Sequence, residues 1–109
     1  MRLLLLALLP AACAPQSLVG GRSACPGAAL LVTNASRVAV EQLYLGQGGD
    51  LIGAVPLPPG QAVRIPLPEA AAGGLRLVWV DGHAAEIPGF NPCVTPRLTV
   101  EEGALQAGR

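Results

Sequence analysis

The chain has no lysine, and its few charges balance. Its 109 residues hold seven arginines against seven acidic residues, which gives a formal net charge of zero at pH 7. Beyond Arg2, the arginines stand singly at positions 22, 37, 64, 76, 97 and 109. A protein that grips nucleic acid normally gathers its basic residues into a patch or stripe. The sequence therefore argues against nucleic-acid binding.

Aromatic residues and histidine are scarce as well. The aromatic residues are Tyr44, Trp79 and Phe90, and His83 is the single histidine. Apolar residues nevertheless make up 51% of the chain, mainly as Ala, Leu and Val. A chain of this length supports one domain with one modest core, and this composition makes that core aliphatic.

The hydrophobic run at the N-terminus is too short to cross a bilayer. Met1-Arg2 precedes the apolar stretch 3–9, whereas a membrane-spanning helix needs about 20 apolar residues. A short, positively charged start followed by such a stretch is typical of an export signal. We assign this signal to residues 1–12, and the Pro-, Ser- and Gly-containing residues 13–24 to a flexible tether.

The signal ends in a stretch that resembles a bacterial lipobox, Leu8-Leu9-Pro10-Ala11-Ala12-Cys13, with Pro10 where the lipobox has Leu. The resemblance implies that Cys13 is acylated and anchors the mature protein in a bacterial membrane. Ala14 after the cysteine implies the outer membrane, on the periplasmic face of the envelope. A soluble periplasmic or secreted chain, released by ordinary signal peptidase, is the alternative.

Short strand-like runs separated by turn signals fill residues 25–102. A phase slip in the apolar alternation near Glu41-Gln42 predicts a β-bulge, and Pro66 predicts an edge strand. We expect an all-β fold, a small immunoglobulin-like β-sandwich of six to seven short antiparallel strands, followed by a frayed tail at 103–109. The expected strands are 28–33, 38–45, 51–55, 61–67, 75–80, 84–87 and 97–101, with a loop at 88–96.

The run 75–80 is the expected centre of this sandwich. Apolar residues occupy both of its alternating faces, which is typical of a strand buried on both sides. A turn at Asp81-Gly82 closes it. In the strand 61–67, Val63, Ile65 and Leu67 alternate inward while Arg64 points outward. The core anchors that we expect are Trp79, Leu77, Val63 and Ile65.

The order of several turn and core motifs resembles bacterial immunoglobulin-like adhesion or spacer modules. These motifs are Asn34-Ala35-Ser36, Leu43-Tyr44, Leu57-Pro58-Pro59-Gly60 and Val80-Asp81. The chain is also similar to small exported alphaproteobacterial proteins of unknown function that share the turn at 57–60 and a late cysteine. Such motifs support a fold and imply no catalytic residue.

Cys25 and Cys93 remain as an even pair once Cys13 is assigned to the anchor. In an oxidising compartment such a pair predicts a disulfide. A metal site is the competing interpretation, but two cysteines without Cys-x-x-Cys spacing and one histidine fall short of the four ligands that zinc prefers. We expect no metal and no other cofactor.

No catalytic constellation stands out. To act as a base, His83 needs a nearby nucleophile and an orienting carboxylate, yet Ser17 and Ser23 lie in the tether and Ser36 in a turn. We therefore expect a non-enzymatic interaction or structural module of the envelope, with an envelope protein as partner.

Two other functions stay open. A periplasmic small-ligand or glycan-binding domain would expose Trp79 and Tyr44 as an aromatic platform, with a weaker contact from His83. A small hydrolase would use His83 as its base. Asn34-Ala35-Ser36 also matches a glycosylation sequon, but behind a bacterial signal we expect Asn34 to serve the turn.

Overall fold

The computed structural model describes residues 28–67 and 72–109, which form seven β-strands. The strands are β1 (Ala29–Asn34), β2 (Val40–Leu45), β3 (Ala62–Pro66), β4 (Gly73–Trp79), β5 (Ala84–Phe90), β6 (Arg97–Glu101) and β7 (Ala104–Gly108). Within these two ranges there is no helix with the length and apolarity needed to span a bilayer. The expected signal peptide, the tether and Cys25 lie outside the described residues.

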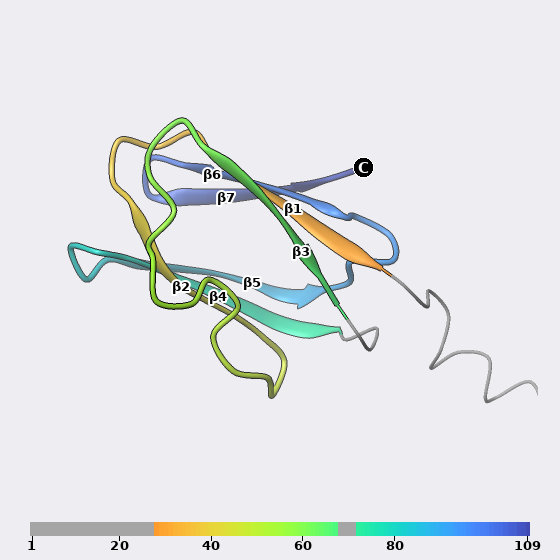
Figure 1. The fold of residues 1–109 in the computed structure, drawn as a ribbon. Helices are drawn as coiled ribbons and strands as arrows, with labels where there is room; N and C mark the ends of the chain where they lie inside the picture. Colours follow the sequence, from red (N-terminus) through yellow and green to blue (C-terminus); the bar gives the residue numbers. More distant parts are fainter. Residues whose placement is uncertain (1–27, 68–71) are drawn as a thin grey trace, which may run out of the picture.

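The strands form two sheets that face each other (Figure 1). One sheet has the order β3-β1-β6-β7 and the other the order β2-β4-β5. Neighbouring strands are antiparallel except β1 and β6, which run parallel. The predicted all-β fold is confirmed.

The strand order differs from that of an immunoglobulin constant domain. In that domain the first strand pairs with the second, and the third, sixth and seventh strands form the other sheet. Here β1 lies between β3 and β6, and the second sheet consists of β2, β4 and β5. The parallel pair also departs from the expected antiparallel arrangement, because β6 returns to pair with β1 in the same direction.

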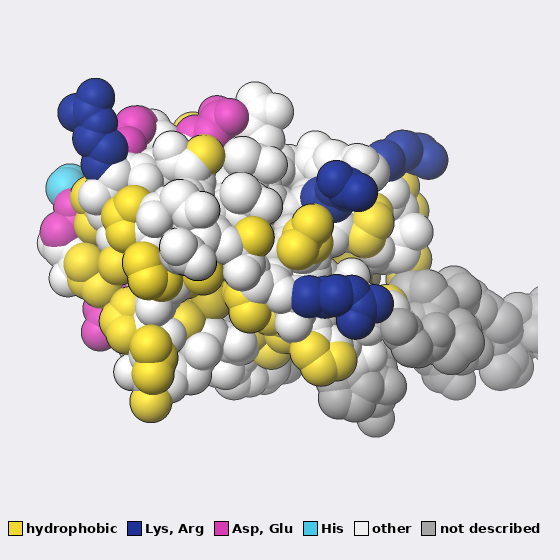
Figure 2. Space-filling view, turned by 45° about the horizontal axis from the view of Figure 1, so that its top comes forward, with side chains coloured by type: hydrophobic (Ala, Val, Ile, Leu, Met, Phe, Trp, Pro, Cys, Tyr) yellow, Lys and Arg dark blue, Asp and Glu magenta, His cyan; other side chains and the backbone are white. Residues whose placement is uncertain are grey.

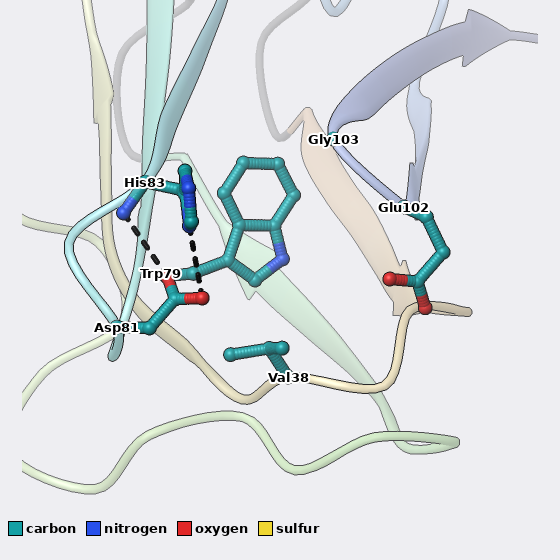
Figure 3. A pocket seen from close by; sticks show the side chains of 6 residues that line it. All are labelled: Val38, Trp79, Asp81, His83, Glu102 and Gly103. Carbon is teal, nitrogen blue, oxygen red and sulfur yellow. Dashed lines mark hydrogen bonds and ion pairs between the residues drawn. The ribbon is translucent and has the colours of Figure 1, made fainter.

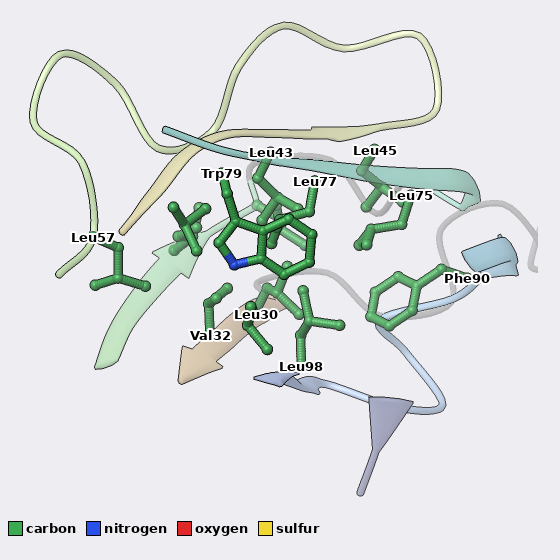
Figure 4. Close-up of a cluster of buried hydrophobic side chains, with 14 residues drawn as sticks. Leu30, Val32, Leu43, Leu45, Leu57, Leu75, Leu77, Trp79, Phe90 and Leu98 are labelled. Carbon is green, nitrogen blue, oxygen red and sulfur yellow. The ribbon is translucent and has the colours of Figure 1, made fainter. Parts of the chain in front are cut away.

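The inner faces of both sheets enclose one aliphatic core (Figure 4). Alternate residues of β1 and β6 meet those of β2 and β4, since successive side chains of a strand point to opposite faces. Burying each large apolar side chain stabilises the fold by about 1.5–3 kcal/mol. The buried apolar residues are Leu30, Val32, Val40, Leu43, Leu45, Leu57, Ile65, Leu67, Leu75, Leu77, Trp79, Phe90, Leu98 and Val100.

Among the expected core anchors, Val63 is the exception. Trp79, Leu77 and Ile65 are buried, whereas Val63 is 36% exposed. Its strand β3 is the outermost of a four-stranded sheet that packs on a sheet of only three strands. The facing sheet therefore does not fully cover this part of the edge. The edge position predicted from Pro66 is confirmed.

The β-bulge predicted in the second strand is also present. The register of β2 with β4 shifts between Val40 and Gln42. Because of this shift, Val40, Leu43 and Leu45 all reach the core despite their broken alternation.

The strand β4 is the centre of its sheet, as predicted, but it is buried on one face only. Leu75, Leu77 and Trp79 point into the core, while Arg76 on the opposite face is exposed. Val80, directly after the strand, is 48% exposed. The expectation of burial on both sides was therefore wrong.

The expected strand at 51–55 is instead a series of bends. Asp50 Oδ1 accepts hydrogen bonds from the backbone N–H of Ile52 at 3.0 Å and of Leu43 at 2.9 Å. Gly53 has a positive φ of 89°, which an extended strand does not allow. The side chain of Asp50 thus holds this segment in a loop beside β2.

Two further segments differ from the expectation near the C-terminus. β5 continues to Phe90, so that the first part of the expected loop 88–96 is strand. Residues 104–108 form β7 instead of a frayed tail, and Leu105 lies opposite Val100 of β6. Pairing with β6 stabilises a sequence of small residues that has little strand preference of its own.

Candidate functional site

One end of the sandwich holds a small pocket of about 240 Å³. Trp79, at the end of β4, forms one wall, with the β4–β5 turn on one side and the β6–β7 turn on the other (Figure 3). Its lining residues come from three segments that are distant in sequence. They are Val38, Trp79, Asp81, His83, Glu102 and Gly103.

Asp81 and His83 form a hydrogen-bonded pair within the β4–β5 turn. Asp81 Oδ1 accepts the backbone N–H of His83 at 3.0 Å, and Asp81 Oδ2 lies 2.9 Å from His83 Nδ1. The side-chain hydrogen bond from His83, followed by the backbone one, lowers the pKa of the Asp81 carboxyl. Gly82 turns the chain between them with a φ of 94°.

This pair lies in water rather than in a closed site. The side chains of His83 and Asp81 are 81% and 43% exposed. A catalytic base needs a nucleophile within hydrogen-bond reach, and among the described residues His83 forms hydrogen bonds only with Asp81 and Trp79. The turn therefore presents a solvated, polar rim to the pocket.

Glu102 provides the other rim of the pocket. One of its carboxylate oxygens, Oε2, accepts the backbone N–H of Arg37 at 2.6 Å. This bond ties the β6–β7 turn to the segment between β1 and β2. Two carboxylates, those of Glu102 and Asp81, thus flank Trp79, and they give this end of the molecule a negative rim.

A buried polar network lies directly beneath Trp79. Ser36 Oγ accepts the indole Nε1–H of Trp79 at 3.1 Å and the backbone N–H of Val38 at 3.3 Å. The hydroxyl lies 2.6 Å from Asn34 Oδ1, to which it donates. Asn34 Nδ2 in turn donates to the backbone oxygens of Val38 and Leu57, at 2.9 and 3.0 Å.

This network assigns structural roles to Asn34 and Ser36. Asn34 is completely buried and Ser36 is 5% exposed, and their polar side-chain atoms are hydrogen-bonded, as buried polar groups require. Ser36 is therefore not presented to the pocket as a nucleophile, and the Asn34 amide is not presented to a glycosylating enzyme. The expected turn role of Asn34 is what the structure shows.

The sequence contains one signal for this network. A buried tryptophan normally finds a hydrogen-bond acceptor for its N–H, and Asn34-x-Ser36 is a short polar motif next to a buried strand. Which acceptor Trp79 selects depends on the packing of β4 against the β1–β2 segment, 43 residues away in sequence.

The other expected site residues are not brought together. Tyr44 is half-buried on β2 opposite Arg76, on the face of the sheet away from Trp79. Because Trp79 is only 3% exposed, these two side chains form no joint aromatic platform. Cys93 lies between β5 and β6, where its backbone N–H donates to Asn91 Oδ1 at 2.9 Å. Its bond to Cys25 stays a prediction, since Cys25 lies outside the described residues.

The described part of the chain contains no group of three or more His, Cys, Asp or Glu side chains suited to a metal ion. Compared with known proteins, the chain matches no protein-family model, and no curated protein or solved structure is significantly similar to it. Function must therefore be argued from the molecule itself.

Proposed function

We propose that this chain is an exported, lipid-anchored protein of the bacterial envelope whose β-domain acts, without catalysis, as an interaction module. Cys13 carries the lipid, and residues 13–24 tether the domain to the membrane. The lipobox-like end of the signal supports the anchor. The resemblance to bacterial immunoglobulin-like spacer modules supports a small β-domain in this role, at the level of architecture and not of strand order.

The observation that carries the interaction role is the edge at β7, which no other strand in the described part of the chain covers. A free sheet edge offers unpaired N–H and C=O groups to a strand of another chain. β7 (Ala104–Gly108) contains neither proline nor a charged residue. It is the last strand of its sheet, and it lies near β5 of the other sheet without being hydrogen-bonded to it.

The other sheet edges are protected. The edge of β2 is covered by the chain's own loop, because Val40 and Leu57 exchange two backbone hydrogen bonds of 2.9 Å. β3 and β5 contain Pro66 and Pro88, which cannot donate to a further strand. A partner segment that adds a strand to this domain therefore pairs with β7.

Proline substitutions at the edge test this mode of binding. Neighbouring residues of an edge strand point their N–H groups alternately inward and outward, so Q106P and A107P remove one group of each kind. We expect the variant that loses an outward-pointing N–H to keep the wild-type free energy of unfolding and to lose binding of the partner. The readout is the size of the complex that contains the protein, in envelope extracts cross-linked before lysis.

The inward variant is the matched control, since it breaks a bond to β6 and destabilises the domain. If the stable variant keeps the same cross-linked complex, β7 is not the docking edge. If the wild-type chain migrates alone after cross-linking, the interaction role itself is wrong.

Ligand binding is the second candidate function, and the pocket beside Trp79 supports it. Its volume of about 240 Å³ is below the range of about 300–1,000 Å³ that is usual for ligand pockets. Trp79 is the single tryptophan, so no other tryptophan contributes to the fluorescence measured beside this pocket. If an envelope sugar shifts this fluorescence in the wild type and not in H83A, the pocket binds a ligand. An unchanged spectrum with every sugar tested removes this function.

A further inference from the structure

The outer face of the four-stranded sheet carries a leucine with one arginine on each side of it. Leu31 of β1 is the register partner of Arg64 in β3 and of Arg97 in β6. Leu30 and Val32 are fully buried, so Leu31 points to the opposite, outer face. With neighbouring strands about 4.8 Å apart, the two arginine backbones lie roughly 10 Å from each other across Leu31.

Between these side chains the surface is hollowed. A shallow groove of about 250 Å³ is lined by Ala29, Leu31, Arg64, Pro96 and Arg97. Its floor is apolar and its two sides are cationic. Guanidinium groups bind phosphate oxygens through paired hydrogen bonds, and an apolar floor suits the glycerol and upper acyl carbons of a lipid.

No carboxylate in the described part of the chain pairs with either arginine. The ion pairs there are Arg76 with Glu86 and His83 with Asp81, both at 2.9 Å. β6 runs parallel to β1, so Glu101 lies at the far end of this face, four positions beyond Arg97. Figure 2 shows arginine side chains gathered toward one end of the molecule and the visible acidic side chains toward the other, where a further arginine lies beside them.

The end of the domain that carries Arg64 and Arg97 is also the end at which β1 begins. Ala28, directly before β1, lies at the same end as Arg64 and Arg97, because β1 begins there and β3 ends there. The chain that leads back toward Cys13 leaves the described domain at this point. In a domain anchored through Cys13, the basic end is therefore the end nearest the tether.

We propose that Arg64 and Arg97, with Leu31 between them, form a docking site for the phosphate groups of anionic phospholipids. This docking role rests on the proposed function, because the anchor at Cys13 brings the domain to the membrane. The affinity for anionic lipid depends only on the groove. Each arginine at an anionic surface strengthens binding about fivefold. Glu101, four positions along β6 and roughly 13 Å from Arg97, lies beyond the Debye length of about 8 Å at physiological salt.

Vesicle binding of the full chain tests the site without the anchor. In a C13A background, we compare R64Q/R97Q with R37Q/R76Q, which loses the same charge elsewhere. Any contribution of the N-terminal segment is common to both variants. We expect phosphatidylglycerol-containing vesicles to bind R64Q/R97Q about 25-fold more weakly than the parent, and R37Q/R76Q within about twofold of it.

Three results overturn the proposal. Equal losses in the two double variants show a general charge effect. Equal binding of the parent to neutral phosphatidylcholine vesicles shows that lipid phosphate charge is not recognised. If inorganic phosphate at constant ionic strength displaces the protein completely from the vesicles, the groove binds free phosphate rather than lipid. Absence of an acyl group on wild-type Cys13 contradicts the anchor alone, and these binding results stand independently of it.

Discussion

The hydroxyl of Ser36 shows how much of this fold depends on single polar groups. Three segments meet at this atom: Trp79 from β4, Val38 from the approach to β2, and Asn34 from the end of β1. All of these bonds are buried or partly buried, and there a hydrogen bond that is left unmade costs more than the same bond contributes when made. Ser36 therefore specifies how the two sheets meet at the pocket end.

Replacing Ser36 by Ala tests this role. The substitution leaves Trp79 Nε1 and one acceptor site of Asn34 without a partner, and we expect the free energy of unfolding to fall by about 1–3 kcal/mol. Urea unfolding followed by Trp79 fluorescence measures it. T99V on the outer face is the control, with an expected change within about 0.5 kcal/mol. Equal values for the two variants would contradict a structural role for the network.

At the scale of single elements, the sequence predicted best those strands whose pattern reflects the core directly. β6 was expected with its observed bounds, and the bulge in β2 followed from the broken alternation. Predictions failed where a contact outside the segment itself decides the outcome. β7 exists because β6 pairs with it, and the small residues of 104–108 do not indicate that pairing. The segment 51–55 is a loop because the carboxylate of the preceding Asp50 accepts its backbone N–H groups, which the apolar pattern of 51–55 does not indicate.

The pocket could not be predicted for the same reason. Its lining comes from the β1–β2 segment, β4, the β4–β5 turn and the β6–β7 turn, and their meeting depends on the sheet order. That order includes the parallel pairing of β1 with β6, which no local pattern indicates. The sequence indicates single features such as the Asp81-Gly82-His83 turn, but it does not indicate that Glu102 faces this turn.

Removing β7 tests whether it is a structural element. A chain that ends after Gly103 loses the pairing with β6 and exposes Val100, so we expect it to lose at least about 2 kcal/mol of stability or not to fold. L105A, which keeps the strand, should cost about 1 kcal/mol because Leu105 is only half-buried. Removing Arg109 alone is the control. An unfolding temperature that is unchanged in all three variants would show that residues 104–108 behave as a frayed tail and not as a structural strand.

Asp50 gives the loop beside β2 a dependence on pH. Burial raises the pKa of its carboxyl, but hydrogen bonds from the backbone of Ile52, Leu43 and Gly53 together lower it below its usual 3.8. A lowered pKa stabilises the fold above the unfolded-state pKa, and this contribution is lost as the pH falls through the folded-state pKa.

Replacing Asp50 by Asn should therefore lower the free energy of unfolding at neutral pH. The difference from the wild type should shrink as the pH falls below about 4. Urea unfolding at a series of pH values measures it, with E41Q as a control for the loss of one exposed carboxylate. A difference that stays constant down to about pH 3 would show that Asp50 stabilises the loop by its shape rather than by its charge.

At the scale of the whole molecule, the sandwich has two unlike ends. One carries the pocket with its acidic rim, and the other carries Arg64, Arg97 and the start of β1. This polarity fits a domain that stands on a membrane and presents its far end and its β7 edge to partners. Cys93 lies in the connection between β5 and β6, which leads from the three-stranded sheet to the four-stranded sheet.

The predicted disulfide between Cys25 and Cys93 would close a loop of roughly 70 residues and stabilise the fold by about 4 kcal/mol in the chain-entropy model. We expect two cysteines to react with an alkylating reagent only after reduction, and the unfolding temperature to fall when they do. C93S should show the same lower unfolding temperature with or without reductant. Two thiols that react before reduction would contradict the bond.

The intact mass of the protein extracted from a bacterial membrane fraction tests the central proposal most directly. We predict a chain that begins at Cys13 and carries the added mass of its lipid, and we predict that C13A moves to the soluble fraction. A mature chain that begins at another residue, without lipid, would contradict the anchored module and leave a diffusible protein in its place.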